Sequence, residues 1–205
     1  MLGTFLAPKR AAKMLLLPIL AIACSPDNEF TRVPYTDVFY QEPTDQVDIL
    51  WVIDNSQSMA DQQAEVASKF DDFIYEIEST ELDFHLGVVT TDLDNTEENG
   101  KLIAPEGEPL YLSAADEGYE DMFRERVQVG IEGSDKERGI DAAYKALSEP
   151  LVTSYNYGFL RSDATLSIIY VSDENDCSDR NELYGYEEED ACYSYADKLV
   201  PIKEL

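Results

Sequence analysis

Basic residues and histidine are scarce in this chain of 205 residues. It has 15 Lys and Arg against 43 Asp and Glu, a formal net charge of −28. Because such a charge repels phosphate backbones, the sequence disfavours nucleic acid as a partner. His85 is the only histidine, and no Gly-x-Ser-x-Gly segment is present, so the sequence offers no serine-hydrolase triad. The acidic composition itself needs no explanation beyond solubility.

The apolar segment at residues 14–23 (MLLLPILAIA) is too short to span a bilayer stably. Because basic residues precede it, it predicts a secretory signal peptide over residues 1–23. The segment ends in Ala-Ile-Ala followed by Cys24, which resembles a bacterial lipobox, so we expect lipid on Cys24. Ordinary cleavage after Ala23 is the alternative. The expected location, after export across the inner membrane, is the cell envelope, at the outer membrane or on the periplasmic face.

Cysteine is also scarce, with three in the chain. If Cys24 carries lipid, Cys177 and Cys192 remain as an even number in an oxidising compartment, and they are the natural disulfide pair. A bond between them would close a loop of roughly 15 residues and contribute about 3 kcal/mol in the chain-entropy model. A pair of free, buried thiols is the alternative.

Residues 24–45 carry prolines among polar residues without sustained periodicity, which predicts a flexible tether ahead of a folded domain over residues 46–205. In that domain, apolar runs typical of buried strands alternate with patterns typical of amphipathic helices. The expected strands are 47–53, 84–91 and 165–171, with shorter edge pieces in 101–112, and the expected helices are 59–78, 120–126 and 137–147. This alternation predicts an α/β fold, with a doubly wound, mostly parallel sheet and helices on both faces.

Ligands of such sheets bind at the carboxyl ends of the strands. There the sequence reads Asp54-Asn55-Ser56-Gln57-Ser58, directly after the first expected strand. One carboxylate and two hydroxyls on alternate positions can direct oxygen atoms at a common centre, and oxygen ligands suit Mg²⁺ or Ca²⁺ rather than zinc or copper. The alternative is that this short Asp/Ser segment only caps the helix that follows.

The segments VDILWVIDNSQSM and IIYVSD resemble the first and fourth strands of von Willebrand factor A (VWA) domains and the metal-ion-dependent adhesion site (MIDAS) that follows them. The resemblance implies one divalent cation, Mg²⁺ first and Ca²⁺ or Mn²⁺ as alternatives, that binds an acidic group of a ligand. The implied metal ligands are Asp54, Ser56, Ser58 and Asp173. The loop 130–139 lacks the family's Thr, so Ser134 is expected to supply a hydroxyl, or Glu137 a carboxylate instead.

The wider run VVTTDL, ERGIDAAYKALSEP and SDENDCS resembles a group of bacterial VWA-domain lipoproteins, over roughly residues 45–205. Thr91 and Asp92 follow the second expected strand near the same crevice, where we expect them to hold the metal ligands in place. A plain turn is the alternative. Since the family's sheet usually has two further strands, we expect this domain to be incomplete at its C-terminal side.

Together these features favour a binding module of the cell envelope, and not an enzyme. The cation would connect the domain to a carboxylate of a protein or another ligand, since it reverses the local field of an acidic site. A structural envelope protein whose metal only stabilises the fold is the alternative. A metal-dependent hydrolase is favoured less, because no residue is clearly spaced to act as a general base or to form a second metal site.

Overall fold

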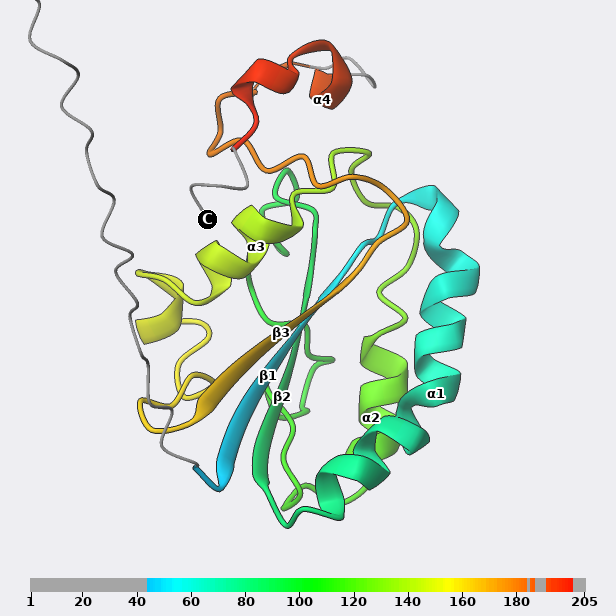
Figure 1. Cartoon of the computed structure of the whole chain (residues 1–205), viewed down its shortest axis with the longest axis vertical. Helices are drawn as coiled ribbons and strands as arrows, with labels where there is room; N and C mark the ends of the chain where they lie inside the picture. The colour runs from blue at the N-terminus through cyan, green and yellow to red at the C-terminus, as the bar shows by residue number, and fades with distance from the viewer. Residues whose placement is uncertain (1–43, 184, 187–190, 201–205) are drawn as a thin grey trace, which may run out of the picture. The chain divides into compact units, whose positions relative to one another are not determined.

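The centre of the domain is a sheet of three parallel strands (Figure 1). A computed structural model describes residues 44–183, 185–186 and 191–200. The strands are β1 (Gln46–Ile53), β2 (Asp83–Thr90) and β3 (Thr165–Val171), in the order β2-β1-β3. β1 pairs with both neighbours, so Ile53 lies opposite Thr90 on one side and Val171 on the other. The carboxyl ends of all three strands therefore meet at one edge of the sheet.

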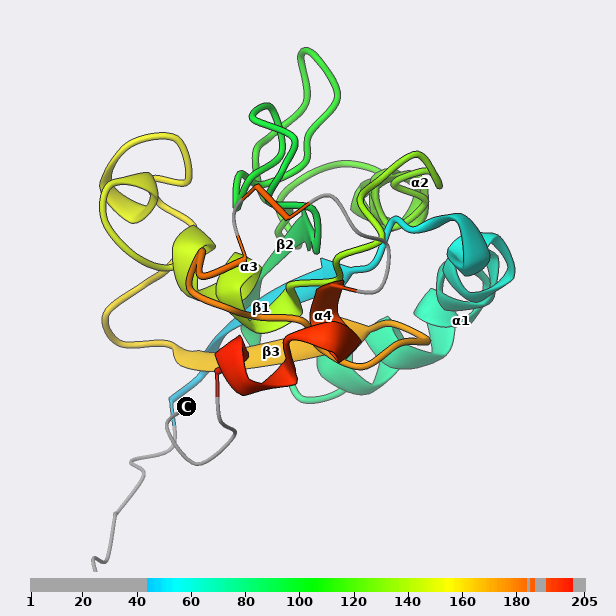
Figure 2. The same cartoon turned by 90° about the horizontal axis from the view of Figure 1, so that it is seen from above.

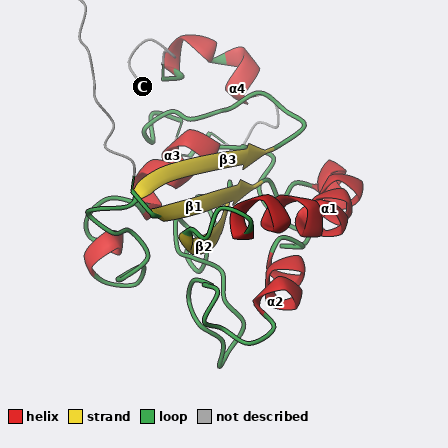
Figure 3. Cartoon of the chain, turned by 60° about the horizontal axis from the view of Figure 1, so that its bottom comes forward, coloured by secondary structure: helices red, strands yellow, loops and turns green. Residues whose placement is uncertain are grey.

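Helices cover both faces of the sheet, as Figures 2 and 3 show. On one face, α1 (Ala60–Glu78) and α2 (Tyr119–Arg126) pack against Trp51 and its neighbours, and the rings of Phe70 and Phe123 stack with their centroids 3.8 Å apart. On the other face, α3 (Gly139–Ala146) packs against Leu50 and neighbouring residues. Because β1 has helices on both sides, its last six residues are buried, as expected of a central strand.

A buried ion pair anchors the amino end of β1. Asp48, the one acid in that apolar strand, is fully buried. It accepts hydrogen bonds from the backbone N–H of Arg161 at 2.6 Å and from its Nε at 2.8 Å. His85 Nδ1 lies 3.6 Å from the same carboxylate and 2.9 Å from the carbonyl oxygen of Phe159. Asp48 therefore joins β1 to the segment that leads into β3.

The segment after β3 is tied back to the domain. Cys177 and Cys192, the pair expected from the sequence, lie at disulfide distance, with the two Cα atoms 5.5 Å apart. Cys192 belongs to the short helix α4 (Ala191–Ser194), which is followed by η3 (Ala196–Lys198). The backbone N–H of Val200 also donates to the carbonyl oxygen of Ser178 at 2.9 Å.

The predicted edge pieces in 101–112 are only partly present. That segment runs along β2, but it forms no strand and makes only the isolated antiparallel bridge between Leu86 and Leu112. Ile103 adds one hydrogen bond from its N–H to the carbonyl oxygen of Val88 at 2.8 Å. Pro105 and Pro109 lack an N–H donor, so a continuous ladder cannot form here. Two other short turns of helix are η1 (Gln57–Met59) and η2 (Leu151–Thr153).

β3 lies at the outer side of the sheet in the described ranges, where it pairs with β1 alone. Its apolar side chains are only partly covered: Leu166 is 40% exposed and Tyr170 is 48% exposed. Such an apolar edge is a surface on which another strand or chain can pair.

The described helices include none that is both long and apolar enough to cross a membrane. The expected signal peptide at residues 1–23, the lipidation site Cys24 and most of the expected tether lie outside the described residues.

A candidate metal centre at the ends of β1 and β3

Asp54 lies where β1 ends, and its position is held from several sides. Its side chain is fully buried. The backbone N–H of Asp54 donates to the carbonyl oxygen of Val171 at 2.9 Å, which extends the pairing of β1 and β3 by one residue. Gln63 of α1 donates from its Nε2 to the carbonyl oxygen of Asp54 at 2.9 Å. Both carboxylate oxygens accept hydrogen bonds, Oδ1 from the N–H of Ser56 at 2.8 Å and Oδ2 from the hydroxyl of Ser172 at 2.7 Å.

The two serines of the Asp-x-Ser-x-Ser segment face the loop after β3. The hydroxyl oxygens of Ser56 and Ser58 are 3.4 Å apart, and the Ser58 hydroxyl donates to Asp173 Oδ1 at 3.1 Å. Gln62 Nε2 lies 3.4 Å from the other oxygen of Asp173. Ser58 and Asp173 are exposed. The four residues expected from the sequence therefore form one chain of hydrogen bonds at one end of the sheet, from Asp54 through Ser56 and Ser58 to Asp173.

Glu137 brings a further carboxylate to this group from the loop before α3. It is 7% exposed, and its backbone carbonyl accepts a hydrogen bond from the N–H of Cys177 at 2.7 Å. The pKa of Glu137 is raised to about 7, first by burial and then by the negative charges of Asp54, Glu174 and Asp135, while a backbone hydrogen bond lowers it. A divalent cation at the site would favour the ionised form of Glu137.

Ser134 lies elsewhere in the same loop. Its hydroxyl donates to Asp94 Oδ2 at 3.1 Å, and its backbone N–H donates to Asp92 Oδ2 at 3.2 Å. Its partners thus belong to the turn after β2. Gly133 sets this path, because its N–H donates to the carbonyl oxygen of Asn55 at 2.8 Å and a Cβ at this position would lie 2.2 Å from the Asn55 side chain. Of the two alternatives, Glu137 and not Ser134 shares a cavity with Ser56 and Ser58.

Thr91 and Asp92 have different surroundings. Asp92 Oδ1 accepts hydrogen bonds from the N–H groups of Asp94 and Asn95, at 2.7 and 3.0 Å, so its carboxylate shapes the turn after β2. Thr91 is 2% exposed, and its hydroxyl has no hydrogen-bond partner within the described part of the chain. It lines a cavity of about 330 Å³ together with Glu137 and Ser172. Thr91 is thus beside the candidate centre with an unused hydroxyl.

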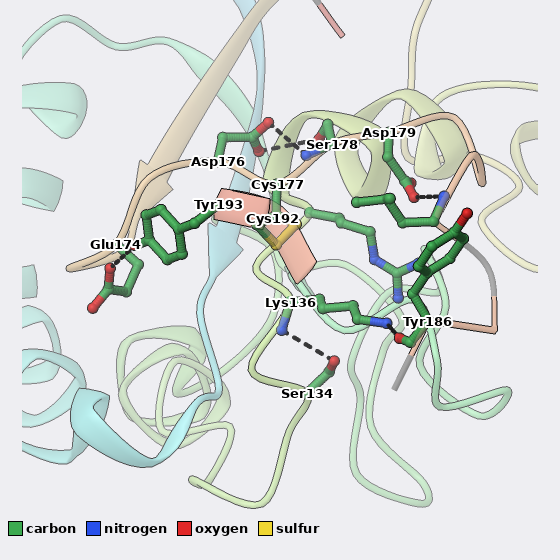
Figure 4. The surroundings of a disulfide bond; sticks show 12 residues. Ser134, Lys136, Glu174, Asp176, Cys177, Ser178, Asp179, Tyr186, Cys192 and Tyr193 are labelled. Atoms are coloured by element: carbon green, nitrogen blue, oxygen red, sulfur yellow. Dashed lines mark hydrogen bonds between the residues drawn. A yellow bond between two sulfur atoms is a disulfide. The ribbon is translucent and has the colours of Figure 1, made fainter. Parts of the chain in front are cut away.

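A larger cavity of about 600 Å³ opens beside the serines. Part of its lining is polar and acidic, and another part comes from the disulfide-linked segment. Figure 4 shows Tyr193 beside Glu174, where the Tyr193 hydroxyl donates to Glu174 Oε2 at 2.9 Å. The lining residues are Ser56, Gln57, Ser58, Asp135, Glu137, Glu174, Asn175, Asp176, Cys192, Tyr193, Ala196 and Leu199.

The donor set fits a hard cation, because it contains carboxylate and hydroxyl oxygens and no thiolate or imidazole. Asp54 and Asp173 supply carboxylates and Ser56 and Ser58 supply hydroxyls, with Glu137 close to Asp54. Among the described residues, no group of three or more His, Cys, Asp or Glu side chains is arranged to hold a metal ion. A metal ion at this site would therefore need the hydroxyl oxygens of Ser56 and Ser58 as ligands, in addition to the carboxylates.

Two residues of this site were missed by reasoning from the sequence. Ser172 donates to Asp54, and Gln63 donates both to the backbone of Asp54 and to the carbonyl oxygen of Gly130 at 2.8 Å. The place of Ser172 directly after a strand is a signal that points to it. Gln63 gives no such signal, since a buried glutamine looks like any other polar residue of a helix.

Comparisons with known proteins identify no relative: the chain matches no protein-family model, and no curated protein or solved structure is significantly similar to it.

Proposed function

We propose that this chain is a cell-envelope binding module of VWA type, and not an enzyme, that holds one divalent cation and uses it to bind an acidic group of a ligand. The observation that supports it most is the contact of Ser58 with Asp173, which joins the segment after β1 to the segment after β3. The parallel order β2-β1-β3, with helices on both faces, supports a doubly wound domain of this kind. The lipid on Cys24 belongs to the same proposal.

In this proposal Asp54, Ser56, Ser58 and Asp173 hold the cation, and Glu137 takes the place first considered for Ser134. Asp54 is held most firmly, because it is buried and two hydrogen bonds, from the N–H of Ser56 and the hydroxyl of Ser172, fix its carboxylate. Mg²⁺ is the expected ion, with Ca²⁺ or Mn²⁺ as alternatives, since all donors are oxygen. The ion would leave a coordination position for a carboxylate of a protein or other ligand. Thr91, which lines a cavity with Glu137 and Ser172, would support the metal ligands, whereas the Asp92 carboxylate shapes the turn after β2.

The test is the melting temperature of the purified full chain in EDTA and in Mg²⁺, Ca²⁺ or Mn²⁺. A ligand that binds only the folded state raises that temperature by mass action. We expect a rise with at least one ion in the wild type and none in Asp54→Ala. Asp72→Asn, which changes an exposed acid on α1, should keep the rise. Equal melting temperatures in EDTA and in every ion would refute a metal centre.

A second function is favoured by the contacts of Asp54 with both strands. Because its N–H bonds to Val171 and its carboxylate to Ser172, a metal at this point would strengthen the junction of β1 and β3. The chain would then be a structural envelope protein whose cation only stabilises the fold. The variant Ser58→Ala distinguishes the two functions. If the chain is a binding module, the variant should lose ligand binding. If the chain is a structural protein, the variant should change only in stability.

A further inference from the structure

The cavity beside the candidate centre has a one-sided charge. Four of its lining residues are carboxylates, Asp135, Glu137, Glu174 and Asp176, and none is Lys or Arg. The basic residues next to Glu137 have partners outside this lining: Lys136 Nζ donates to the carbonyl oxygen of Tyr186, and Arg138 pairs with Asp94 at 2.7 Å. The described lining therefore carries no positive charge that would balance its acids.

The acids do not all have a structural task. Asp176 has one, because its oxygens accept hydrogen bonds from the N–H of Ile140 at 3.0 Å and from Ser178. Glu174 accepts only the hydroxyl of Tyr193 through its side chain, and Asp135 is exposed with no hydrogen bond of its carboxylate among the described contacts. The Asp135 carboxylate and the second oxygen of Glu174 are thus available to a ligand.

A second, independent observation is an unused polar group in the adjoining smaller cavity. The Thr91 hydroxyl is buried and unpaired, and Thr91 lines the smaller cavity, which shares Glu137, Glu174 and Asp176 with the larger one. A buried hydroxyl without a partner costs free energy, so such groups are normally satisfied by water, an ion or a ligand.

Another part of the lining, the apolar wall, is largely apolar. It consists of Cys192, Tyr193, Ala196 and Leu199, which the disulfide to Cys177 holds over the cavity. Figure 4 shows this bond between the loop after β3 and α4. A ligand that enters the cavity can therefore meet both carboxylates and aliphatic or aromatic surface.

We propose that the ligand carries a cationic group beside its carboxylate, as in a peptide in which Lys or Arg lies close to Asp or Glu. This inference rests on the proposed function, in which the carboxylate binds the metal. One divalent cation balances at most two charges, and Asp54, Asp173 and Glu137 already supply three carboxylates around it. An acidic ligand without a positive group would therefore add to the unbalanced charge of the cavity. An ammonium or guanidinium group would meet Glu174 and Asp135, and its aliphatic stem would lie on the apolar wall.

The experiment is calorimetric titration of the full chain, in saturating Mg²⁺, with two blocked tripeptides. One is Lys-Ala-Asp, and the other is the same peptide with an acetylated lysine side chain, which removes the charge and keeps the carboxylate. We expect the acetylated peptide to bind about tenfold more weakly, the loss typical of a hydrogen bond between charged groups. The double variant Asp135→Asn with Glu174→Gln should bind both peptides equally. The control Asp72→Asn with Glu76→Gln changes two exposed acids of α1 and should keep the tenfold difference.

The outcomes separate this inference from the proposed function. Equal binding of both peptides by the wild type, abolished by Asp54→Ala, would overturn the cationic subsite and leave the metal-mediated function intact. No binding of Mg²⁺ and no binding of either peptide would overturn both. Binding of several Mg²⁺ ions that falls to one in the double variant would also overturn the subsite, because metal ions and not a ligand would then balance these acids. A matched thermal unfolding curve for each variant shows that it is folded.

Discussion

The hydroxyl of Ser58 donates a hydrogen bond to Asp173 Oδ1 at 3.1 Å, although the two residues are 115 positions apart in the chain. The contact exists because β1 and β3 are parallel neighbours in register, so the segments that follow them leave the sheet side by side. Asp54 lies between them, bonded to the backbone of Val171 and to the hydroxyl of Ser172. The chemistry of the site is therefore assembled by strand pairing.

Asp173→Ala should weaken Mg²⁺ binding by about tenfold or more, since loss of even a supporting group at a metal site costs that much. Its side chain is exposed, so the melting temperature in EDTA should stay near that of the wild type. Calorimetric titration with Mg²⁺ measures the affinity. Unchanged affinity would exclude Asp173 as a ligand.

Glu137→Gln should lower Mg²⁺ affinity more than Ser134→Ala does. Glu137 lies close enough to Asp54 for their charges to interact, whereas the Ser134 hydroxyl is bonded to Asp94. Titrating both variants with Mg²⁺ under the same conditions gives the comparison. If Ser134→Ala proved the more damaging, the loop would have to rearrange when the cation binds.

The metal-free protein should lose stability as the pH rises from about 4.5 to 7. The folded-state pKa of Glu137 is raised to about 7 from 4.5, so its stabilising contribution is complete below pH 4.5 and is lost as the pH passes the folded-state value. The shift corresponds to on the order of 3 kcal/mol. Urea unfolding in EDTA across this range should show the decline, and Glu137→Gln should remove it. Mg²⁺ should also reduce this loss of stability with rising pH, because the cation favours the ionised carboxylate of Glu137.

Arg161→Ala should destabilise the fold by about 3 to 5 kcal/mol, because it leaves the fully buried Asp48 without its charged partner. Arg161→Lys should cost less, since it keeps the charge but not the fork geometry. Lys69→Ala, at an exposed position of α1, is the control and should change little. Chemical unfolding monitored by the fluorescence of Trp51 measures the effect, and a loss below 1 kcal/mol would show that the buried pair is dispensable.

Replacing both Cys177 and Cys192 by alanine should lower the free energy of unfolding by about 3 kcal/mol, given their separation of 15 residues. It should also release the wall of the cavity, which would appear as faster amide exchange in residues 191–200 with β1 unchanged. A reductant should have the same two effects on the wild type and none on the double variant. Unchanged exchange after reduction would mean that other contacts, such as that of Val200 with Ser178, suffice to hold the wall.

The main elements could be predicted because each has a local pattern. The runs at 47–53 and 165–171 are apolar and β-branched, and both became strands with bounds within one residue of the prediction. The helix expected from Met59 to Glu78 is α1, preceded by one short turn of η1. The segment 101–112 shows where the pattern fails. Its apolar residues lie along β2, but prolines limit them to an isolated bridge.

The site was predictable in part for the same reason. Asp54, Ser56 and Ser58 are neighbours in the chain, so the turn after a strand brings them together. The choice between Ser134 and Glu137 was not predictable, because it depends on the path of a loop that packs against Asn55.

The sequence by itself determined the positions of the strands, the alternation of helices between them, the acidic character and the cysteine pair, because these follow from local periodicity, charge and residue count. The tertiary structure alone decided that Ser58 meets Asp173, that Glu137 joins them and that the disulfide-linked segment covers an acidic cavity. The physical reason is that these contacts join loops far apart in the chain. Their geometry is set by the register of parallel strands and by burial, and no pattern of neighbouring residues encodes it.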